Sequence, residues 1–570
     1  MLIEEKLDST TEKRLHDAIA LQQADQGTQA IIQYQLILNA YPNHSLVHHL
    51  LGITLAQCGT LDRALKSLQT AVRLQPKNPL YLSSLANILR RQGETEKATS
   101  YFEKALAINP QLVSAHNNLA LIFFTDDAKR AESHLRQALE IMPDHVDANY
   151  NLGLLLHDCN RHQAKIYFER AAHSNNQFIP ARYQLAQIYQ AEKAYRKAIN
   201  WYQSILQIMP SHPDATYKIG LTYLELDDTK RGLDYLEQAL QLQPDQDDIH
   251  HNLACVYHHL KRYQDALTHW LQHQQRQPDI MTTYNIGVCY LYLGRYQDAQ
   301  DHLFEVIRLS PDHHSALVNL GATFLQRNQP ELACEYYERA QDIRPSDAIS
   351  HVLSALKQDK SHQETAPPSY VTDLFDNYAL HYDNHLSDVL DYQLPKRLSH
   401  MISSLLHLAP LSSLTLDLGC GTGLCADALR PISRELVGID LSQNMLDQAS
   451  KKSRYDRLIC SNIETLQHEY ARRCDLLLCA DTLPYIGDLT KLFTAASEYL
   501  TTNGYWIFSI EDCHKKDFSL NQTARFSHNP EYIRRLCGSF GFSVFHHERL
   551  ALRTQQNAYV DGVVFILSKI

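Results

Sequence analysis

Hydrophobic and polar positions in the first 345 residues follow a helical spacing that restarts about every 34 residues. Prolines stand at 42, 76, 110, 143, 210, 244, 278, 311 and 345, in steps of 34, 34, 33, 67, 34, 34, 33 and 34 residues. The step of 67 spans two units, with Asn176 in the place of the middle proline. Because proline ends a helix, each unit is predicted to hold two helices that stop before it.

Small and large apolar residues recur at fixed positions within the units. A Leu or Ile followed by Gly or Ala recurs as Leu51-Gly52, Leu119-Ala120, Leu152-Gly153, Leu253-Ala254, Ile286-Gly287 and Leu320-Gly321. An alanine follows about twelve residues later and an aromatic residue four after that, as in Ala164 and Phe168. We expect the small residues to lie where the two helices of a unit cross closely.

This arrangement resembles tetratricopeptide repeats, whose period and small, aromatic and proline positions it matches. The resemblance implies about ten repeats between roughly residues 10 and 345, stacked as an α-solenoid whose concave face is laid down by the first helix of each repeat. Residues 347–357 are expected to form a capping helix. The partner that the resemblance implies is a protein or peptide in the concave groove.

Asparagine recurs immediately before the Leu/Ile-Gly/Ala pair. It occupies this column at Asn118, Asn151, Asn252, Asn285 and Asn319. An amide side chain can both donate to and accept from a peptide main chain. The column resembles the asparagine ladder in the repeats of O-linked N-acetylglucosamine transferase, so we expect these residues to bind an extended peptide. The alternative is that they are ordinary solvated residues of the repeat.

Beyond a polar, proline-containing stretch, short apolar strands alternate with helices. Strands are expected at 414–418, 435–440, 457–461, 474–480, 504–511 and in a final pair near 542–552 and 559–568. This alternation predicts an α/β domain with a mostly parallel sheet. We therefore divide the chain into a solenoid at 1–357, a linker at 358–370 and an α/β domain at 371–570. Ligands of such sheets lie at the carboxyl ends of the strands.

The turn after the first strand carries Gly419, Gly421 and Gly423, but Leu424 stands where a dinucleotide fingerprint needs its third small residue. Asp417 lies two residues before the first glycine. A carboxylate there would repel a pyrophosphate and attract an ammonium group. S-adenosylmethionine (SAM) has an ammonium and a sulfonium group and no phosphate, so the turn predicts SAM as the cofactor.

The ends of the next strands supply the other expected cofactor contacts. Asp440 ends the second strand, where a carboxylate can accept from both ribose hydroxyls. Asn462 follows the third strand, and its amide oxygen is expected to accept from the adenine amino group. The remaining expected contacts are Cys420, Leu441, Met445, Ile463 and Ala480.

These motifs, in this order, resemble class I SAM-dependent methyltransferases over roughly residues 370–570. The chain is also similar to methyltransferases fused to tetratricopeptide repeats, through FDNYALHYDNHL (375–386), CADTLPYIGDL and RFSHNPEYIRRLCGSFGF (525–542). The resemblance implies a Rossmann-like domain and a methyltransferase activity (EC 2.1.1.-). By the same analogy, Tyr378 and Tyr382 would lie near SAM.

Candidate residues for the chemistry lie close to the expected methyl donor. His528 and Asp481 are expected to accept a proton or orient the acceptor, and Tyr378 is a further candidate. Arg525 would suit an anionic substrate. His528 is predicted in a loop before a helix at 529–537; the alternative role is to cap that helix or bind backbone.

Composition and charge argue against several kinds of partner. A formal net charge of -11 without a Lys/Arg cluster argues against nucleic acid as a partner. We expect no membrane span, because no apolar run reaches about 18 residues. The 12 cysteines form no CxxC pair, and the histidines form no ligand set, so we expect no metal site. With no secretory signal in the first residues, a cytoplasmic protein is expected.

Three functions fit these features. The first is a methyltransferase that modifies a polypeptide recruited by the repeat groove. The second is an O-methyltransferase of a small or carrier-bound acid, with the repeats serving assembly. The third is a repeat scaffold whose SAM-binding domain is not catalytic.

Overall fold

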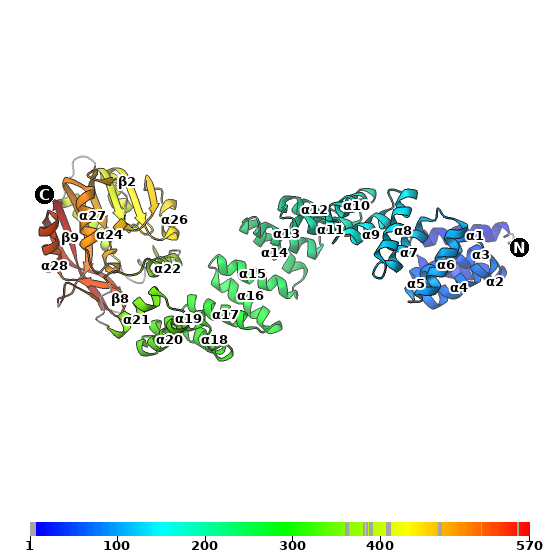
Figure 1. Cartoon of the computed structure of the whole chain (residues 1–570), viewed down its shortest axis with the longest axis horizontal. Coiled ribbons are helices and arrows are strands. Elements are labelled where there is room, and N and C mark those ends of the chain that lie inside the picture. The colour runs from blue at the N-terminus through cyan, green and yellow to red at the C-terminus, as the bar shows by residue number, and fades with distance from the viewer. Residues whose placement is uncertain are drawn as a thin grey trace. The chain divides into compact units, whose positions relative to one another are not determined.

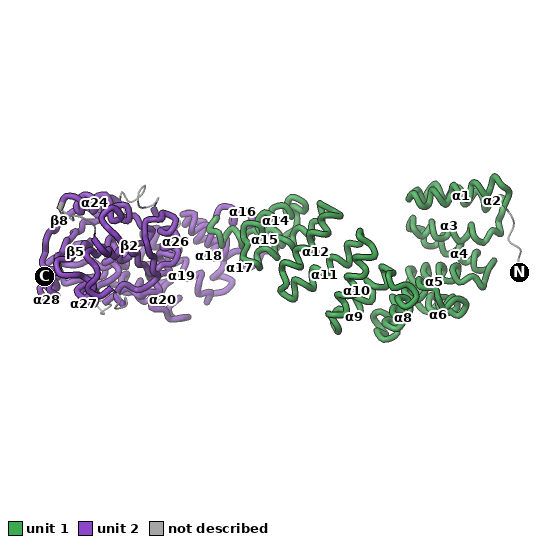
Figure 2. The backbone as a smooth tube through the Cα atoms, turned by 90° about the horizontal axis from the view of Figure 1, so that it is seen from above, with its two compact units in different colours: residues 1–262 green, residues 263–570 purple. Residues whose placement is uncertain are grey.

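The computed structural model describes residues 7–358, 364–379, 382–383, 386, 392–405, 412–465, 470–514, 516–555 and 558–570. The chain divides into two compact units, Met1–Arg262 and Tyr263–Ile570 (Figure 2). Consecutive helix pairs make up the first unit and the beginning of the second, which then continues into an α/β domain (Figure 1).

The first unit consists of helices that are mostly 11 to 15 residues long and separated by short turns. They are α1 (Ser9–Gln23), α2 (Gly27–Ala40), α3 (Ser45–Gln57), α4 (Leu61–Leu74), α5 (Pro79–Arg91), α6 (Thr95–Ile108), α7 (Val113–Phe123), α8 (Ala128–Ile141), α9 (Val146–Leu156), α10 (Arg161–Ser174), α11 (Ile179–Ala191), α12 (Tyr195–Ile208), α13 (Pro213–Leu224), α14 (Thr229–Leu242) and α15 (Asp247–His259).

The small residues of the repeat lie at close helix crossings, as the spacing predicts. A Cβ atom on Gly52 of α3 would lie 2.6 Å from Cγ of Leu68 in α4. A Cβ atom on Gly153 of α9 would lie 2.7 Å from the ring of Phe168 in α10. Real Cβ atoms do not approach this closely, so glycine is what lets the paired helices pack at this distance.

The second unit opens with the same helical pattern. Its repeat helices are α16 (Tyr263–Arg276), α17 (Ile280–Tyr292), α18 (Tyr296–Leu309), α19 (His314–Gln326), α20 (Pro330–Ile343) and α21 (Asp347–Lys357). The helix expected at 347–357 is therefore present as α21. It packs against α20 through a cluster that includes Tyr337, Ile349 and Leu353.

The α/β domain is built on a seven-stranded sheet of order β3-β2-β1-β4-β5-β9-β8. Neighbours are parallel from β3 to β5, whereas β9 is antiparallel to both β5 and β8. The strands are β1 (Ser412–Leu418), β2 (Ser433–Asp440), β3 (Arg457–Cys460), β4 (Cys474–Cys479), β5 (Leu500–Glu511), β8 (Phe542–Gln555) and β9 (Ala558–Lys569). The predicted mostly parallel sheet is confirmed.

Helices cover both faces of this sheet because its central strands are apolar on both sides. Leu477 of β4 packs in the same cluster as Phe493 and Ile533, whereas its neighbour Leu478 packs with Leu398 and Leu429 on the other face. Helices α27 (Thr490–Tyr499) and α28 (Pro530–Phe540) pack in the first cluster, and α24 (Leu394–Leu405) and α25 (Ala426–Leu429) in the second. Helix α26 (Gln443–Lys451) contacts β2 and β3, and α22 (Pro368–Tyr378) packs with Tyr485 and Phe526. This pattern is typical of parallel sheets buried on both faces.

A short hairpin was not expected from the sequence. Strand β6 (Phe518–Leu520) pairs antiparallel with β7 (Phe526–His528), and the turn between them covers residues 521–525. Neither strand has more than three residues, so neither shows the alternating pattern that identifies a strand in sequence.

Residues 364–366, which fall within the linker expected at 358–370, are paired with the α/β domain. Thr365 forms a β-bridge with Ile486, and Ala366 N donates to Tyr485 O at 2.9 Å. Glu364 O accepts from the backbone N–H groups of Gly487 and Asp488. Residues 364–366 thus lie in the wall of the domain, although the linker expected at 358–370 included them.

No helix in the described ranges is long and apolar enough to cross a bilayer. Within the same ranges, no three His, Cys, Asp or Glu side chains gather in a way that could hold a metal ion.

Candidate functional site

The turn after β1 has the backbone conformation that its glycines allow. Gly419, Gly421 and Gly423 have φ values of 75°, 55° and 81°, in the left-handed region. A Cβ atom on Gly419 would lie 2.3 Å from Oγ1 of Thr482, which follows β4. The turn therefore lies tightly against the end of β4, and two of its glycines, Gly419 and Gly421, face a cavity.

This cavity lies where the carboxyl ends of β1, β2 and β4 meet, and it holds about 880 Å³ of space outside the protein atoms, including its open mouth. Its lining consists of Thr365, Ala366, Pro368, Val371, Phe375, Tyr382, Gly419, Gly421, Asp440, Leu441, Asn462, Ile463, Glu464, Ala480, Asp481, Thr482, Tyr485 and Ile486.

Asp440 is held rigidly at the end of β2. Its Oδ2 accepts from Gly421 N at 2.8 Å, and its Oδ1 accepts from Ser442 N at 2.9 Å. Burial raises the pKa of this carboxyl above its usual value, while these backbone donors oppose the shift. Each oxygen retains a lone pair, so the side chain can accept further hydrogen bonds from a ligand in the cavity.

Asp417 does not line the cavity. Its side chain is buried behind the turn, where Tyr455 Oη donates to Asp417 Oδ2 at 2.7 Å. Burial raises the pKa of Asp417 to about 7. The structure therefore places this carboxyl beneath the cofactor turn rather than in direct contact with the cavity.

Two polar side chains that follow β3 line the cavity, and the sequence analysis identified only the first, Asn462. Asn462 lines the cavity, but its Oδ1 already accepts from Glu464 N at 2.9 Å. Glu464 also lines the cavity, and burial raises the pKa of its carboxyl. Glu464 therefore adds a carboxyl group to the cavity lining two positions after Asn462.

The other residues expected to contact the cofactor either line the cavity or are buried in the structure around it. Leu441, Ile463, Ala480 and Tyr382 line the cavity. Cys420, Gly423 and Met445 are buried in the surrounding structure and do not line it. Tyr378 ends α22, and its side chain lies outside the described residues.

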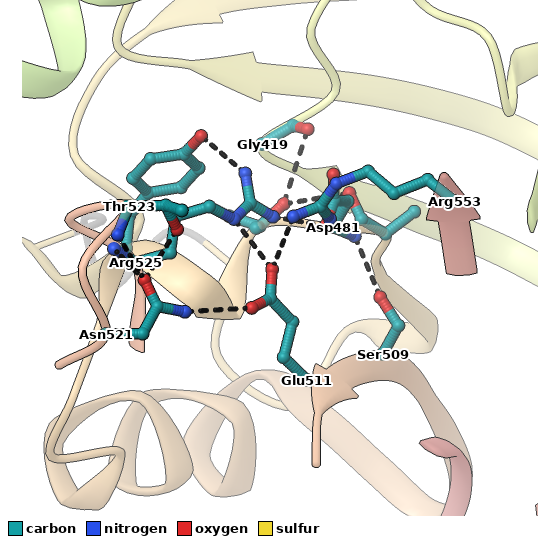
Figure 3. Close-up of polar contacts among 11 residues, drawn as sticks. Gly419, Asp481, Ser509, Glu511, Asn521, Thr523, Arg525 and Arg553 are labelled. Atoms are coloured by element: carbon teal, nitrogen blue, oxygen red, sulfur yellow. Dashed lines mark hydrogen bonds and ion pairs between the residues drawn. The ribbon is translucent and has the colours of Figure 1, made fainter. Parts of the chain in front are cut away.

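A four-residue ion-pair network closes the side of the cavity at the end of β4 (Figure 3). Asp481 Oδ1 lies 2.6 Å from Arg525 Nη2 and 3.3 Å from Arg553 Nη1. Glu511 Oε1 lies 2.7 Å from Arg525 Nε and 2.7 Å from Arg553 Nη2. Two buried guanidinium groups are therefore matched by two buried carboxylates.

The ion pairs of this network offset the cost of burying its four charged groups. Each of the four side chains is at most 12% exposed. Burial alone would raise the pKa of Glu511, but Arg525 and Arg553 outweigh that effect and hold it below its usual value. Arg525 Nη1 also donates to Tyr485 Oη at 2.7 Å, which connects the network to a cavity-lining tyrosine.

This pairing corrects the expected role of Arg525. Its guanidinium group was expected to be available for an anionic substrate, but two carboxylates already neutralise it. Removing either carboxylate from such a network leaves an uncompensated buried charge. Arg525 therefore acts as a structural part of the cavity wall.

The expectation that His528 accepts a proton is wrong. His528 lies on β7 rather than in a loop, and its side chain is fully buried. Its Nε2 is 2.8 Å from Ile486 O and 3.0 Å from Gly487 O, so this nitrogen carries a hydrogen that it donates to both carbonyls. Burial lowers the pKa of His528 to about 4, and the residue does not line the cavity.

In the first unit, the asparagine column connects successive repeats. Asn151 Nδ2 donates to Asn117 Oδ1 at 3.0 Å. Asn252 Nδ2 donates to Tyr217 Oη at 2.8 Å and to Asp248 O at 2.7 Å, which uses both of its hydrogens. Asn118 Nδ2 donates within its own helix, to Ser114 O. Each of these three residues thus uses at least one amide hydrogen within the array.

The second unit contains the last two members of the column. Asn319 Nδ2 donates to Tyr284 Oη at 3.1 Å, which is the same kind of contact as in the first unit. Asn285 is partly buried on α17. That all five residues bind a peptide stays a prediction.

The cavity's chemistry suits a cationic cofactor. Asp440, Glu464 and Asp481 contribute carboxylates to its lining, and no Lys, Arg or His is among the described lining residues. A nucleoside with an amino-acid tail and a sulfonium group matches this acidic surface.

Known protein families match both the helical array and the α/β domain. Residues 416–508 match the methyltransferase domain family. Residues 79–144, 185–252 and 279–346 match tetratricopeptide repeat families.

Individual relatives cover only parts of the chain. A ubiquinone biosynthesis O-methyltransferase of Coxiella burnetii is 29% identical over 98 residues, covering 16% of this chain and 42% of that protein. The chain spans 17% and 42% of the length of the first two curated relatives, so it shares less than half of either.

Two solved structures are similar to different parts of the chain. One is a tetratricopeptide repeat protein with an unusual peptide-binding site, at 23% identity and a TM-score of 0.29, covering 35% of this chain and 99% of that one. The other is magnesium protoporphyrin IX methyltransferase from Synechocystis PCC 6803 with bound SAH, at 14% identity and a TM-score of 0.29, covering 36% and 100%.

The repeat matches and the methyltransferase match fall on the helical array and on the sheet with the acidic cavity, respectively. The chain therefore contains tetratricopeptide repeats followed by a methyltransferase domain that uses S-adenosylmethionine.

Proposed function

We propose that this protein transfers a methyl group from SAM to a side chain of a polypeptide that its repeats recruit. When bound, SAM supplies an electrophilic methyl group on a sulfonium, and the protein's task is to position and desolvate the acceptor. The observation that carries the proposal is the charge of the cavity: Asp440 and Glu464 make its lining negative, whereas Asp481 and Glu511 are paired with the two nearby arginines.

This charge distribution favours an amine or neutral acceptor over an acid. A carboxylate acceptor would be repelled by Asp440 and Glu464, and no Lys, Arg or His among the described lining residues offsets that repulsion. An amine has the opposite preference, because these carboxylates attract its protonated form, which then loses a proton to solvent before attack. Lysine side chains and chain N-termini are the amines that a protein offers.

We propose specific roles for the cavity residues. Asp440 would accept from the ribose hydroxyls, and Glu464 from the adenine amino group. Asp481 and Tyr485, which Arg525 holds in place, would orient the acceptor. Tyr382 would cover the cofactor beside Gly421, since a Cβ atom on that glycine would lie 3.9 Å from its ring.

The repeats support a polypeptide as the substrate. Tetratricopeptide arrays present a concave face to protein segments, and the oxygens of the asparagine column can accept from peptide N–H groups. Recruitment by the array would raise the effective concentration of the target at the catalytic domain.

A second function is a small-molecule O-methyltransferase in which the repeats serve assembly. It is favoured by the curated relative of Coxiella burnetii, whose name describes a small-molecule O-methyltransferase. Neutral hydroxyl acceptors are also compatible with the cavity's charge.

One labelling experiment tests the proposal. Full-length protein and Asp440→Ala are incubated with tritiated SAM and cell lysate, and label is followed separately in the protein and small-molecule fractions. The proposal expects label in a polypeptide only with the unsubstituted protein. Label confined to small molecules would overturn it in favour of the second function, and an amino-acid analysis showing a methyl ester would contradict the amine acceptor.

A further inference from the structure

The last repeat helix contacts the hairpin of the α/β domain through one histidine. His351 of α21 is fully buried, and its Nε2 lies 3.1 Å from Ala524 O. A carbonyl only accepts, so His351 is the donor. The imidazole ring also lies 4.9 Å from the ring of Tyr370 in α22 and 6.0 Å from that of Phe526 in β7. Helix α21 is thereby fixed to the hairpin.

The turn that receives this hydrogen bond is tight. Asn521 N donates to Arg525 O at 2.8 Å, and Ala524 N donates to Asn521 O at 3.0 Å. Asn521 Oδ1 accepts from the backbone N–H groups of both Thr523 and Arg525. Ala524 itself has φ of 59°, a conformation that costs a non-glycine residue energy. External support at its carbonyl offsets that cost.

The residue after Ala524 is Arg525, whose side chain joins three elements around the cavity. It contacts Asp481 after β4, Tyr485 in the turn that follows and Glu511 at the end of β5 (Figure 3). Asp481 and Tyr485 line the cavity. A displacement of the turn by even a fraction of an ångström would therefore move the cavity wall.

We propose that His351 is a positioning residue for the methyltransferase site. By donating to Ala524 O, it holds the 521–525 turn where Arg525 can support Asp481 and Tyr485. The last helix of the repeat array is then an integral part of the catalytic domain's wall. This inference needs the SAM site but does not depend on which acceptor is methylated.

Two substitutions in the full-length protein separate the hydrogen bond from the packing. His351→Phe keeps an aromatic ring beside Tyr370 and Phe526 but leaves Ala524 O without its donor. His351→Gln keeps an N–H donor but loses the ring. We expect SAM binding, measured by calorimetry, to weaken by about tenfold in H351F, because a buried hydrogen bond is lost, and to be largely restored in H351Q. Hydrogen exchange should be faster at the amides of 521–525 in H351F only.

A matched control lies in the first unit. His250 is also buried on a repeat helix, with Nε2 3.2 Å from Pro244 O, but it lies outside the α/β domain. His250→Phe should lower the melting temperature without changing SAM affinity or exchange at 521–525. Unchanged affinity and exchange in a folded H351F would overturn the proposal. If H351F does not fold, H351Q provides the test. A folded H351Q that binds SAM weakly while its hydrogen exchange at 521–525 is normal would also overturn the proposal.

Discussion

Arg525 Nη2 and Asp481 Oδ1 are 2.6 Å apart, which places an ion pair, rather than an available cation, at the wall of the cofactor cavity. Together with Arg553 and Glu511, this pair makes the wall electrically neutral. The cavity's charge is therefore set by Asp440 and Glu464, and it favours cationic ligands.

The first prediction concerns the network. Glu511→Gln removes one charge without changing the shape of the side chain, so Arg525 and Arg553 are left with a single carboxylate between them. We expect a loss of about 3 kcal/mol in unfolding free energy, because a buried charge becomes uncompensated. Denaturant unfolding of the full chain measures it. Glu531→Gln, on the exposed start of α28, is the control and should change stability little. A loss below about 1 kcal/mol in E511Q would contradict the arrangement.

The second prediction concerns the cofactor. Asp440→Ala removes the acceptor that fixes Gly421 N and Ser442 N, together with the proposed ribose contact. SAM affinity should fall by about 100-fold, which corresponds to about 2.7 kcal/mol. Calorimetric titration measures it. Asp427→Ala provides the comparison, since Asp427 is exposed on α25; its affinity should equal that of the unsubstituted protein. Normal SAM binding by D440A would exclude Asp440 as a cofactor contact.

The third prediction follows from the raised pKa of Asp417. Its pKa is about 7 in the folded protein against an ordinary value of 3.8, so between these values the folded state holds the proton more tightly than the unfolded state. This carboxyl therefore stabilises the fold at low pH, and its contribution is lost as the pH rises from about 4 to about 7. Asp417→Asn cannot ionise, so it should gain stability relative to the unsubstituted protein over that range.

The size of this gain has an upper bound of about 4 kcal/mol between pH 4 and pH 8, from the difference between the two pKa values. Unfolding free energies of both proteins at several pH values measure it, and other titrating groups cancel in the difference. Parallel stability curves for the two proteins would show that Asp417 ionises normally in the fold.

The fourth prediction concerns the array. Asn252→Ala removes two hydrogen bonds, one of them to Tyr217 in the preceding repeat, and should destabilise the chain by about 1 kcal/mol or more. Asn252→Asp can still accept from the Tyr217 hydroxyl and loses only the hydrogen bond to Asp248 O, so it should be destabilised less than Asn252→Ala. Thermal unfolding measures both. If either variant keeps its full stability but loses peptide binding, the asparagine column binds peptide and does not stabilise the array.

The elements that the sequence predicted well are those with strong periodicity. The repeat helices follow from a period sustained over 345 residues, and the parallel strands follow from apolar runs that both sheet faces bury. Strand β4, expected at 474–480, spans Cys474–Cys479. The glycine turn and Asp440 were found because their positions depend on local geometry at a strand end.

The parts that were missed depend on contacts between distant segments. Nothing in the local sequence shows that Arg525 meets Asp481, 44 positions away, or that Glu511 accepts from Arg553. His528 was misread for the same reason, since the carbonyls of Ile486 and Gly487 that engage it belong to another element. Glu464 carried a visible signal, an acidic residue two positions after Asn462.

The pairing of residues 364–366 with residues 485–488 limits where a fragment of the catalytic half can begin. A fragment begun at residue 416, where the family match starts, would leave the amides of Gly487 and Asp488 without their acceptor and would strip Thr365, Ala366 and Phe375 from the cofactor's surroundings. If such a fragment were inactive, the reason would be the loss of these residues around the cavity. The result would give no information about the chemistry of the full-length protein.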